Sequence, residues 1–358
     1  MTVARARPAA SEPSMVEDLL EPASPSSPDQ PRRGNHRRWT SALLSYLVMV
    51  YVLITLNFLL PRLMPGDPIN GLLGQASSHF NGGDQTRAAL RKYYGLNGSV
   101  LSQYRHYLWR LAHGDLGRSV TNLASVGHEI RRALPWTLLL IGSSIAVSLT
   151  IGMVAGIHAG WRRDRPADRA LMTGLIAVWQ FPSYLLGSIL LFVFAVKFHW
   201  LPLNGAQTDL AGFGWVQKVP DIGRHLLLPL VVLTASLTAW NYLLMRAGMV
   251  TELGSDYLML GRAKGLRPRR LKYRYAARNA LLPLVSNAAL DIGFAVAANV
   301  VVEQVFSYPG LGGLLFGSIA TRDYPVIQGV FLVLSLGIVT INALADVLYR
   351  RLDPRTAV

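Results

Sequence analysis

Apolar residues occur along this chain in six long runs, separated by polar segments of very different length. The runs are 20 to 27 residues long and cover residues 41–60, 136–157, 170–196, 226–245, 281–302 and 326–345. An α-helix rises 1.5 Å per residue, so about 20 apolar residues cross the roughly 30 Å hydrocarbon layer of a bilayer. The pattern predicts an all-α polytopic membrane protein with about six transmembrane helices.

The polar segments divide the chain into predicted parts. Residues 1–38 are rich in Pro, Ser, Ala, Arg and Glu and hold few aliphatic residues, so we expect a disordered cytoplasmic tail. In the long loop after the first run we expect short amphipathic helices between glycine turns. The other predicted parts are a first span at 39–63, an extracytoplasmic loop subdomain at 64–135, a five-span core at 136–350 that includes a basic loop at 252–280, and a cytoplasmic tail at 351–358.

The first apolar run has a second interpretation, as part of a signal peptide. The apolar region of a signal peptide usually has about 7 to 15 residues and ends at small residues. This run is longer, holds no charged residue, and is followed by Pro-Arg-Leu-Met-Pro-Gly-Asp-Pro at 61–68. These features favour an uncleaved span.

Basic residues predict the orientation of the spans. Short cytoplasmic loops of membrane proteins carry an excess of Lys and Arg. The alternate segments starting from the first tail are basic, with Arg32, Arg33, Arg37, Arg38, Arg162, Arg163, Arg165, Arg169, eight Lys and Arg between 256 and 283, Arg350, Arg351 and Arg355. The short loops on the other side hold fewer, namely Lys197, Lys218, Arg224 and Arg322. Both termini are therefore predicted to be cytoplasmic.

Composition agrees with a membrane protein. Hydrophobic residues make up 51% of the chain, charged residues 15%, and the mean hydropathy is +0.30. The formal net charge of +15 lies in clusters beside the apolar runs, as orientation signals and contacts with anionic lipids do. We therefore expect membrane lipids, and no nucleic acid, among the partners. The absence of cysteine excludes disulfides, thiol nucleophiles and thiolate metal sites.

The segment after the fourth run has the most informative pattern. It reads DYLMLGRAKGLRPRRLKYRYAARNALLP from Asp256 to Pro283. Gly265 tolerates φ > 0, so a helix can end there and the chain can turn. Pro268 suits the first position of a second helix, because its missing N–H would be unpaired there anyway. A helix, a turn and a second helix are predicted.

Three small or aliphatic residues of this loop, Ala263, Leu266 and Leu271, are expected to form an apolar knob. Such a knob would fit a groove on another protein, and Arg262 and Lys264 would meet acidic groups at its rim. An ordinary turn whose arginines serve only as an orientation signal and a lipid anchor is an equally good interpretation of these residues alone.

In its order of residues this segment resembles the cytoplasmic coupling loop of permease subunits of ATP-binding-cassette (ABC) importers of the dipeptide, oligopeptide and nickel family. The residues that match are Asp256, Tyr257, Arg262, Ala263, Lys264, Gly265, Leu266, Arg278, Asn279 and Pro283. Five further motifs match in order and spacing: PGDP at 65–68, GDLGRS at 114–119, FSYPGLG at 306–312, RDYP at 322–325 and LDPR at 352–355. The long loop after the first span is similar to the first of the two permeases that such importers usually pair.

One part of the loop departs from the pattern. The family usually places Glu-Ala-Ala before the glycine turn, where this chain has Met259, Leu260 and Gly261. Gly261 is expected to weaken the local helix by about 0.5 to 1 kcal/mol relative to Ala.

The resemblance implies a type I ABC importer permease fold and a function in alternating access. It implies a second homologous permease subunit, two ABC ATPase subunits that bind the coupling loops, and an extracytoplasmic solute-binding protein. ATP and Mg would be held by the ATPase subunits, and this chain has no Walker sequence of its own. The location implied is the bacterial plasma (inner) membrane, and di- or oligopeptides are the first solute class, ahead of nickel and other small solutes.

Polar residues within the runs are candidates for the translocation path. Asp291 is the ionisable residue inside the fifth run, and Asn287 and Asn299 share its helix face. Asn241 in the fourth run is a further candidate, and Pro182 in the third run, next to Gln180, is expected to cause a kink. Hydrogen bonds that fix helix packing are an equally good interpretation of the same residues.

We expect no catalytic residues and no metal site. No His-Glu-x-x-His sequence occurs, and Asp291 has no charged companion within the runs. A proton-coupled secondary transporter is the alternative function, but it would need several buried titratable groups and broken inverted repeats. A structural membrane scaffold is a third possibility, which intact transport in loop variants would favour.

Overall fold

The computed structural model describes residues 35–63, 99–208 and 214–352. The chain divides into two compact units, Met1–Ser45 and Tyr46–Val358, and the account below concerns the second. Several predicted features lie outside the described residues: most of the N-terminal tail, the first 35 residues of the long loop with the motif at 65–68, and the last six residues.

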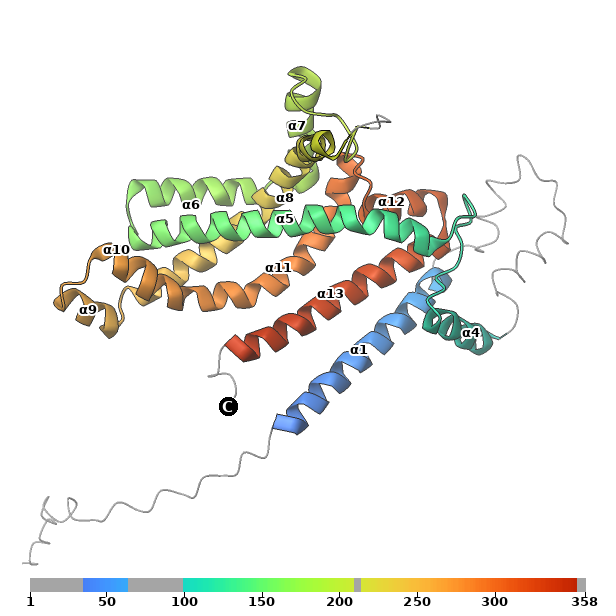
Figure 1. Ribbon diagram of the computed structural model, residues 1–358, viewed down its shortest axis with the longest axis horizontal. Helices are drawn as coiled ribbons and strands as arrows, with labels where there is room; N and C mark the ends of the chain where they lie inside the picture. The colour runs from blue at the N-terminus through green and yellow to red at the C-terminus, as the bar shows by residue number, and fades with distance from the viewer. Residues whose placement is uncertain (1–34, 64–98, 209–213, 353–358) are drawn as a thin grey trace, which may run out of the picture. The chain divides into compact units, whose positions relative to one another are not determined.

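The described residues are helical, apart from turns and one isolated β-bridge between Arg118 and Ser125. In chain order (Figure 1) they form α1 (Asn35–Leu63), α4 (Val100–Ala112), α5 (Val126–Trp161), α6 (Pro166–Trp179), α7 (Ser183–Leu191), the π-helical turn η1 (Phe192–Lys197), α8 (Trp215–Glu252), α9 (Asp256–Ala263), α10 (Pro268–Arg270), the π-helical turn η2 (Leu271–Ala276), α11 (Ala277–Val305), α12 (Leu311–Thr321) and α13 (Tyr324–Leu352). The all-α prediction is confirmed for this part of the chain.

Three described helices are long and apolar enough to cross a membrane: α5, α8 and residues 324–345 of α13. The count rises to five if α6 with α7 and η1, and α10 to α11, are each taken as one bent span. Helix α1 adds a shorter apolar stretch, Leu43–Leu59. Each of the six predicted runs lies within one of these helices or bent pairs.

The third predicted run is broken rather than straight. Helices α6 and α7 meet at 94° around Phe181 and Pro182. Proline lacks a backbone N–H and disfavours helical geometry in the residue before it, so the helix ends there. The kink expected at Pro182 is confirmed. Helix α5 also begins at Val126, ten residues before the predicted border at 136, because Pro135 is accommodated inside it.

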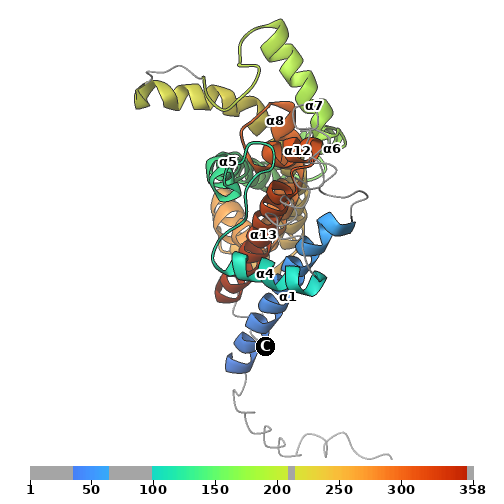
Figure 2. The same ribbon diagram turned by 90° about the vertical axis from the view of Figure 1, so that its right-hand side faces the viewer.

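Helices α5, α8 and α11 pack along one another, and α12 and α13 pack against α5 and α11 (Figure 2). The tightest approach uses three glycines at four-residue spacing on one face of α5. A Cβ atom added at Gly152, Gly156 or Gly160 would lie 2.6 to 2.7 Å from the Cβ atom of a residue of α8. Small residues at such spacing let two membrane helices approach closely.

Candidate functional site

The basic loop folds as its residues predict. Helix α9 ends after Ala263, and Gly265 takes φ +73°, with its N–H donating to the Arg262 carbonyl at 2.9 Å. The N–H of Leu266 donates to the Gly261 carbonyl at 3.1 Å, which closes the turn. Pro268 then starts α10. The helix, turn and second helix are therefore confirmed as local structure.

The inner face of α9 packs into a buried cluster. Leu258 and Leu271 are almost completely buried, together with Met245 and Met249 of α8. Leu271 therefore belongs to the core, and the prediction that it forms part of an exposed knob is wrong. The sequence of the loop could not show this, because the fold of η2 back onto α9 decides which way Leu271 faces.

Gly261 also has a role that the sequence did not reveal. A Cβ atom at Gly261 would lie 2.6 Å from Cδ2 of Leu271. The missing side chain makes room for Leu271, so the departure from the family pattern at this position permits close packing of α9 on η2.

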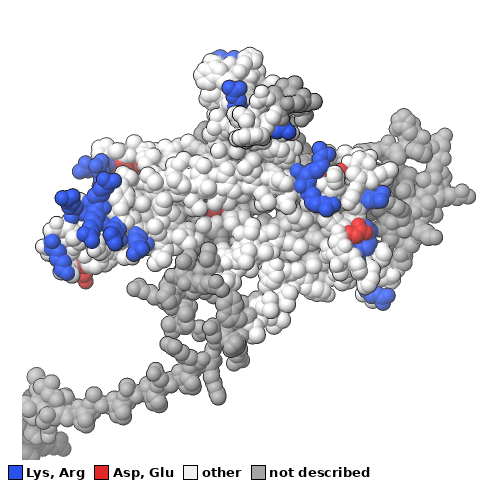
Figure 3. Space-filling view, in the orientation of Figure 1, with Lys and Arg blue, Asp and Glu red and all other residues white. Residues whose placement is uncertain are grey.

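The outer face of α9 is apolar and basic. Met259 is 65% exposed and Leu260 56% exposed, and Ala263 is exposed beside them, as are Arg262 and Lys264. These five residues are called the outer face of α9 below. Figure 3 shows Lys and Arg gathered at this end of the unit, where α9, α10 and the turn between α5 and α6 lie (Figure 1).

Hydrogen bonds tie the loop to both flanking helices. The Tyr257 hydroxyl donates to the carboxylate of Glu252 at the end of α8, and Asn279 Nδ2 of α11 donates to the Tyr257 oxygen at 3.1 Å. Burial, together with the hydrogen bond to Glu252, raises the pKa of Tyr257. Asp256 lies in the first turn of α9, where an acidic side chain stabilises a helix. The loop is thus attached by hydrogen bonds to both α8 and α11.

The two remaining predicted loop residues, Arg278 and Pro283, take no part in these hydrogen bonds. Arg278 is exposed in the first turn of α11, and Pro283 lies inside the same helix. The structure therefore brings together the predicted residues from Asp256 to Leu266 with Asn279.

The predicted polar residues of the spans divide into two groups. Asn287 Nδ2 donates to Asp291 Oδ1 at 3.0 Å, and Asp291 and Asn241 are both buried, at 2% and 0% exposure. One oxygen of Asp291 and both polar side-chain atoms of Asn241 lack a hydrogen bond of good geometry among the described residues, although the two side chains interact with each other. Asn299 instead donates to Glu303 at 2.5 Å.

Glu303 was missed by the sequence reasoning, because the fifth run ends one residue before it. Its carboxylate is fully buried at the start of α12 and accepts hydrogen bonds from Thr137 Oγ1 at 2.7 Å and from the backbone N–H groups of Gly312 and Gly313 at 2.6 and 3.0 Å. The N-terminus of a helix carries unpaired N–H groups and partial positive charge. The run at 281–302 holds Asp291 as its charged residue, as predicted, but helix α11 continues to Val305 and carries Glu303 as a second buried acidic side chain.

An ion pair that the sequence did not predict joins α6 to α8. Arg246 Nε and Nη2 donate to the two carboxylate oxygens of Asp168 at 2.7 and 2.5 Å, and the Tyr242 hydroxyl donates to Asp168 Oδ1 at 3.1 Å. A two-bond Arg–carboxylate pair fixes geometry as well as charge. This pair holds the turn between α5 and α6 in place.

Two of the matching motifs meet on the opposite side of the bundle. Asp323 of the motif at 322–325 accepts hydrogen bonds from Ser119 Oγ at 2.5 Å and from the N–H groups of Val120 and Thr121 at 3.0 and 3.1 Å. Ser119 closes the motif at 114–119, so these distant motifs form one structural unit.

Comparisons with known proteins agree with this architecture. A family model described as the inner membrane component of binding-protein-dependent transport systems matches residues 148–358. The glutathione transport system permease protein GsiC of Escherichia coli O6:H1 (strain CFT073) is 35% identical over 312 residues, which cover 87% of this chain and 96% of that protein. GsiC of Escherichia coli strain K12 and of Shigella dysenteriae serotype 1 are each 34% identical with the same coverage.

A solved structure shows the same fold. It is that of the MetNI methionine ABC transporter in inward-facing conformations, and it aligns with a TM-score of 0.52 at 16% sequence identity, over 63% of this chain and 96% of the matched chain. Since the family model spans more than half of the chain and the relatives match over nearly their full length, this protein belongs to the family of inner membrane components of binding-protein-dependent transport systems, as a permease subunit of an ABC importer.

Proposed function

We propose that this chain and a second, homologous permease form the translocation path of an importer for short peptides in the bacterial plasma membrane. Two ABC ATPase subunits hold the ATP and Mg and bind the coupling loops, this chain binds no cofactor of its own, and an extracytoplasmic solute-binding protein delivers the solute. Both termini lie in the cytoplasm, as the distribution of Lys and Arg favours.

The outer face of α9 is the observation that supports ATPase docking most directly. Met259 and Leu260 expose apolar surface at the end of the molecule where basic residues gather, and burying half of such a side chain contributes on the order of 1 kcal/mol. Arg262 and Lys264 beside them suit a groove with an acidic rim and would speed association.

The contacts of the loop explain how a movement of α9 would be transmitted to the long helices α8 and α11. Leu258 and Leu271 fill the inner side of α9, and Tyr257 links the ends of α8 and α11. A displacement of α9 by an ATPase therefore acts on two long helices at once. Alternating access requires only that the ATPase dimer favour one of two pore states by a few kcal/mol.

Co-purification tests the docking. The chain is expressed with the permease and ATPase subunits encoded beside it, and the wild type is compared with Leu260→Asp. Burial of a carboxylate in an apolar groove is costly, so we expect about tenfold less ATPase with the variant. Leu101→Asp on α4 is the matched control, since Leu101 is also exposed (69%) but lies outside the basic loop. Equal recovery of ATPase with both variants would contradict the proposal.

Short peptides are the proposed solute class because relatives matched over 96% of their length are named for glutathione transport. ATP-dependent uptake of labelled glutathione and of dipeptides by the reconstituted importer tests this class. Competition by excess nickel but not by peptides would point to the metal branch of the family instead.

The group of Asn241, Asn287 and Asp291 is proposed as a polar part of the path. Buried polar atoms without hydrogen bonds of good geometry are costly, which favours a role for Asn241 and Asp291 in a second conformation where α8 and α11 separate. Asp291→Asn keeps the shape and the hydrogen bonding of the side chain, so we expect normal stability with reduced peptide uptake. A loss of stability with normal uptake per folded molecule would favour helix packing.

A further inference from the structure

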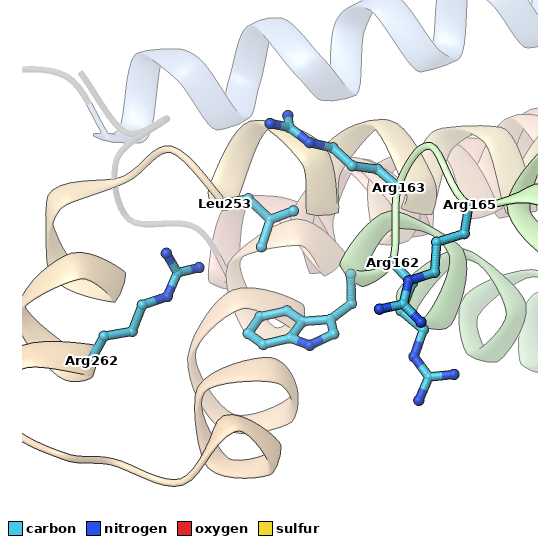
Figure 4. A pocket seen from close by; sticks show the side chains of 6 residues that line it. Arg162, Arg163, Arg165, Leu253 and Arg262 are labelled. Carbon is cyan, nitrogen blue, oxygen red and sulfur yellow. The ribbon is translucent and has the colours of Figure 1, made fainter.

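A cavity of about 500 Å³ lies between the α5–α6 turn, the end of α8 and α9. Figure 4 shows Arg262 reaching in from α9 on one side, with the arginines of the α5–α6 turn on the other. The cavity is lined by Trp161, Arg162, Arg163, Arg165, Leu253 and Arg262. Four of its six lining residues are therefore cationic. Arg262 also belongs to the outer face of α9, but an orientation signal does not require the other three arginines to line one cavity.

The positive charge of this cavity is largely uncompensated. Among the described residues, the ion pair made by these four arginines is Arg163 Nε to Asp164 Oδ2 at 4.0 Å, with both side chains exposed. Exposed pairs of this kind contribute little. Asp168, the next carboxylate along the turn, is already held by Arg246. A concave surface lined by one sign of charge concentrates counter-ions, so the cavity is suited to an anion.

The level of the cavity relative to the membrane indicates which anion it binds. Helix α5 ends at Trp161 and α6 begins at Pro166, so the cavity opens where two apolar spans end. Tryptophan is enriched at this level of membrane proteins, where lipid headgroups lie. Basic pockets between membrane helices on the cytoplasmic side bind phosphate-bearing headgroups, and guanidinium groups match phosphate oxygens in geometry.

We propose that this cavity binds the phosphodiester headgroup of an anionic phospholipid of the cytoplasmic leaflet. The guanidinium groups hold the phosphate oxygens, and the acyl chains run along the apolar surface of α5 and α6. Because Arg262 comes from α9 and the other three arginines come from the α5–α6 turn, one bound lipid bridges the coupling loop to the bundle. The site goes beyond the proposed transport function, because three of its four arginines, Arg162, Arg163 and Arg165, lie outside the outer face of α9, while Arg262 belongs to both.

Lipid binding to the purified chain tests the site. Short-chain phosphatidylglycerol and phosphatidylcholine are titrated into the detergent-solubilised protein, and retained lipid is measured by native mass spectrometry. The variant is Arg163→Gln with Arg165→Gln. The control is Arg269→Gln with Arg270→Gln, which removes the same charge from exposed residues of α10 outside the cavity.

Each arginine near an anionic surface contributes about fivefold in affinity, so we expect the cavity variant to lose phosphatidylglycerol affinity by roughly 25-fold. The control variant is expected to change by less than about fivefold, which is the contribution of a single arginine. Equal losses in both variants, or equal binding of the zwitterionic lipid by the wild type, would overturn the proposal. Displacement of the lipid by inorganic phosphate at equal concentration would overturn the lipid assignment in favour of a free anion.

Hydrogen exchange tests the site on the wild-type protein alone, so it does not depend on whether the cavity variant folds. Wild-type protein in phosphatidylglycerol nanodiscs is compared with wild-type protein in phosphatidylcholine nanodiscs. Slower exchange is expected with the anionic lipid in residues 161–165 and in α9, which carry five of the six lining residues. Unchanged exchange in these segments would count against the site.

Discussion

Close packing of α5 on α8 predicts that a single methyl group at the centre of their contact destabilises the bundle. A Cβ atom at Gly156 would lie 2.7 Å from the Met245 Cβ atom, 2.9 Å from the Tyr242 carbonyl oxygen and 3.0 Å from the Arg246 backbone nitrogen. Two of these three atoms are backbone atoms of a helix and cannot rotate away. In Gly156→Ala the two helices must therefore separate locally.

The size of the effect follows from these distances. Ordinary contacts of a Cβ atom begin near 3.4 Å, so the helices must separate by about 0.7 Å, the difference between 3.4 and 2.7 Å. A gap of about 0.5 to 1 Å forfeits a quarter to a half of the dispersion energy of each contact it opens. Overpacking costs about 1 to 3 kcal/mol, and the higher helix propensity of Ala offsets up to about 1 kcal/mol of this. We expect a net loss of about 1 to 2 kcal/mol.

Unfolding by sodium dodecyl sulfate in mixed micelles, followed by tryptophan fluorescence, measures this loss. Gly142→Ala is the matched control, because Gly142 lies on the same helix and an added Cβ meets nothing within 4 Å. The control is expected to be neutral or slightly stabilising. Equal stability of the two variants would refute the argument that α5 and α8 need glycine at their contact.

Three further substitutions test other contacts in the same unfolding assay. Glu303→Gln places an amide N–H₂ against N–H donors at the start of α12, so we expect a loss of about 1.5 to 3 kcal/mol, and unchanged stability would argue against a carboxylate cap there. Arg246→Lys replaces two hydrogen bonds to Asp168 by one, with an expected loss of about 1 kcal/mol, and wild-type stability would show that the second bond contributes nothing. Gly261→Val would push α9 away from Leu271, costing about 1 to 3 kcal/mol and reducing ATPase recovery; a variant equal to wild type in both would contradict the packing described for α9.

Features that depend on neighbouring residues were predictable from the sequence. The turn at Gly265, the helix start at Pro268 and the break at Pro182 follow from backbone rules that act over a few residues. The apolar runs likewise predict helices, because about 20 apolar residues in succession suit a membrane span. The all-α architecture and the two-helix form of the basic loop therefore follow from local sequence alone.

Features that depend on distant contacts were not predictable in this way. The buried position of Leu271 depends on how η2 folds back onto α9. Apart from Asn299, the partners of Glu303 come from two other segments of the chain, and Asp168 is separated from Arg246 by 78 residues. The borders of the apolar runs also exclude such groups, because the fourth run stops just before Arg246 and the fifth just before Glu303.

The central claim is that the outer face of α9 contacts an ATPase subunit. The chain contains no cysteine, so Ala263→Cys introduces a single thiol on an exposed position of that face. This thiol is labelled with benzophenone maleimide before the ATPase subunits are added, and the assembled importer is then illuminated, with Leu101→Cys on α4 as the control. We predict a cross-linked product of this chain with one ATPase subunit from position 263 and none from position 101. No ATPase product from position 263, in complexes that retain the ATPase, would contradict the claim.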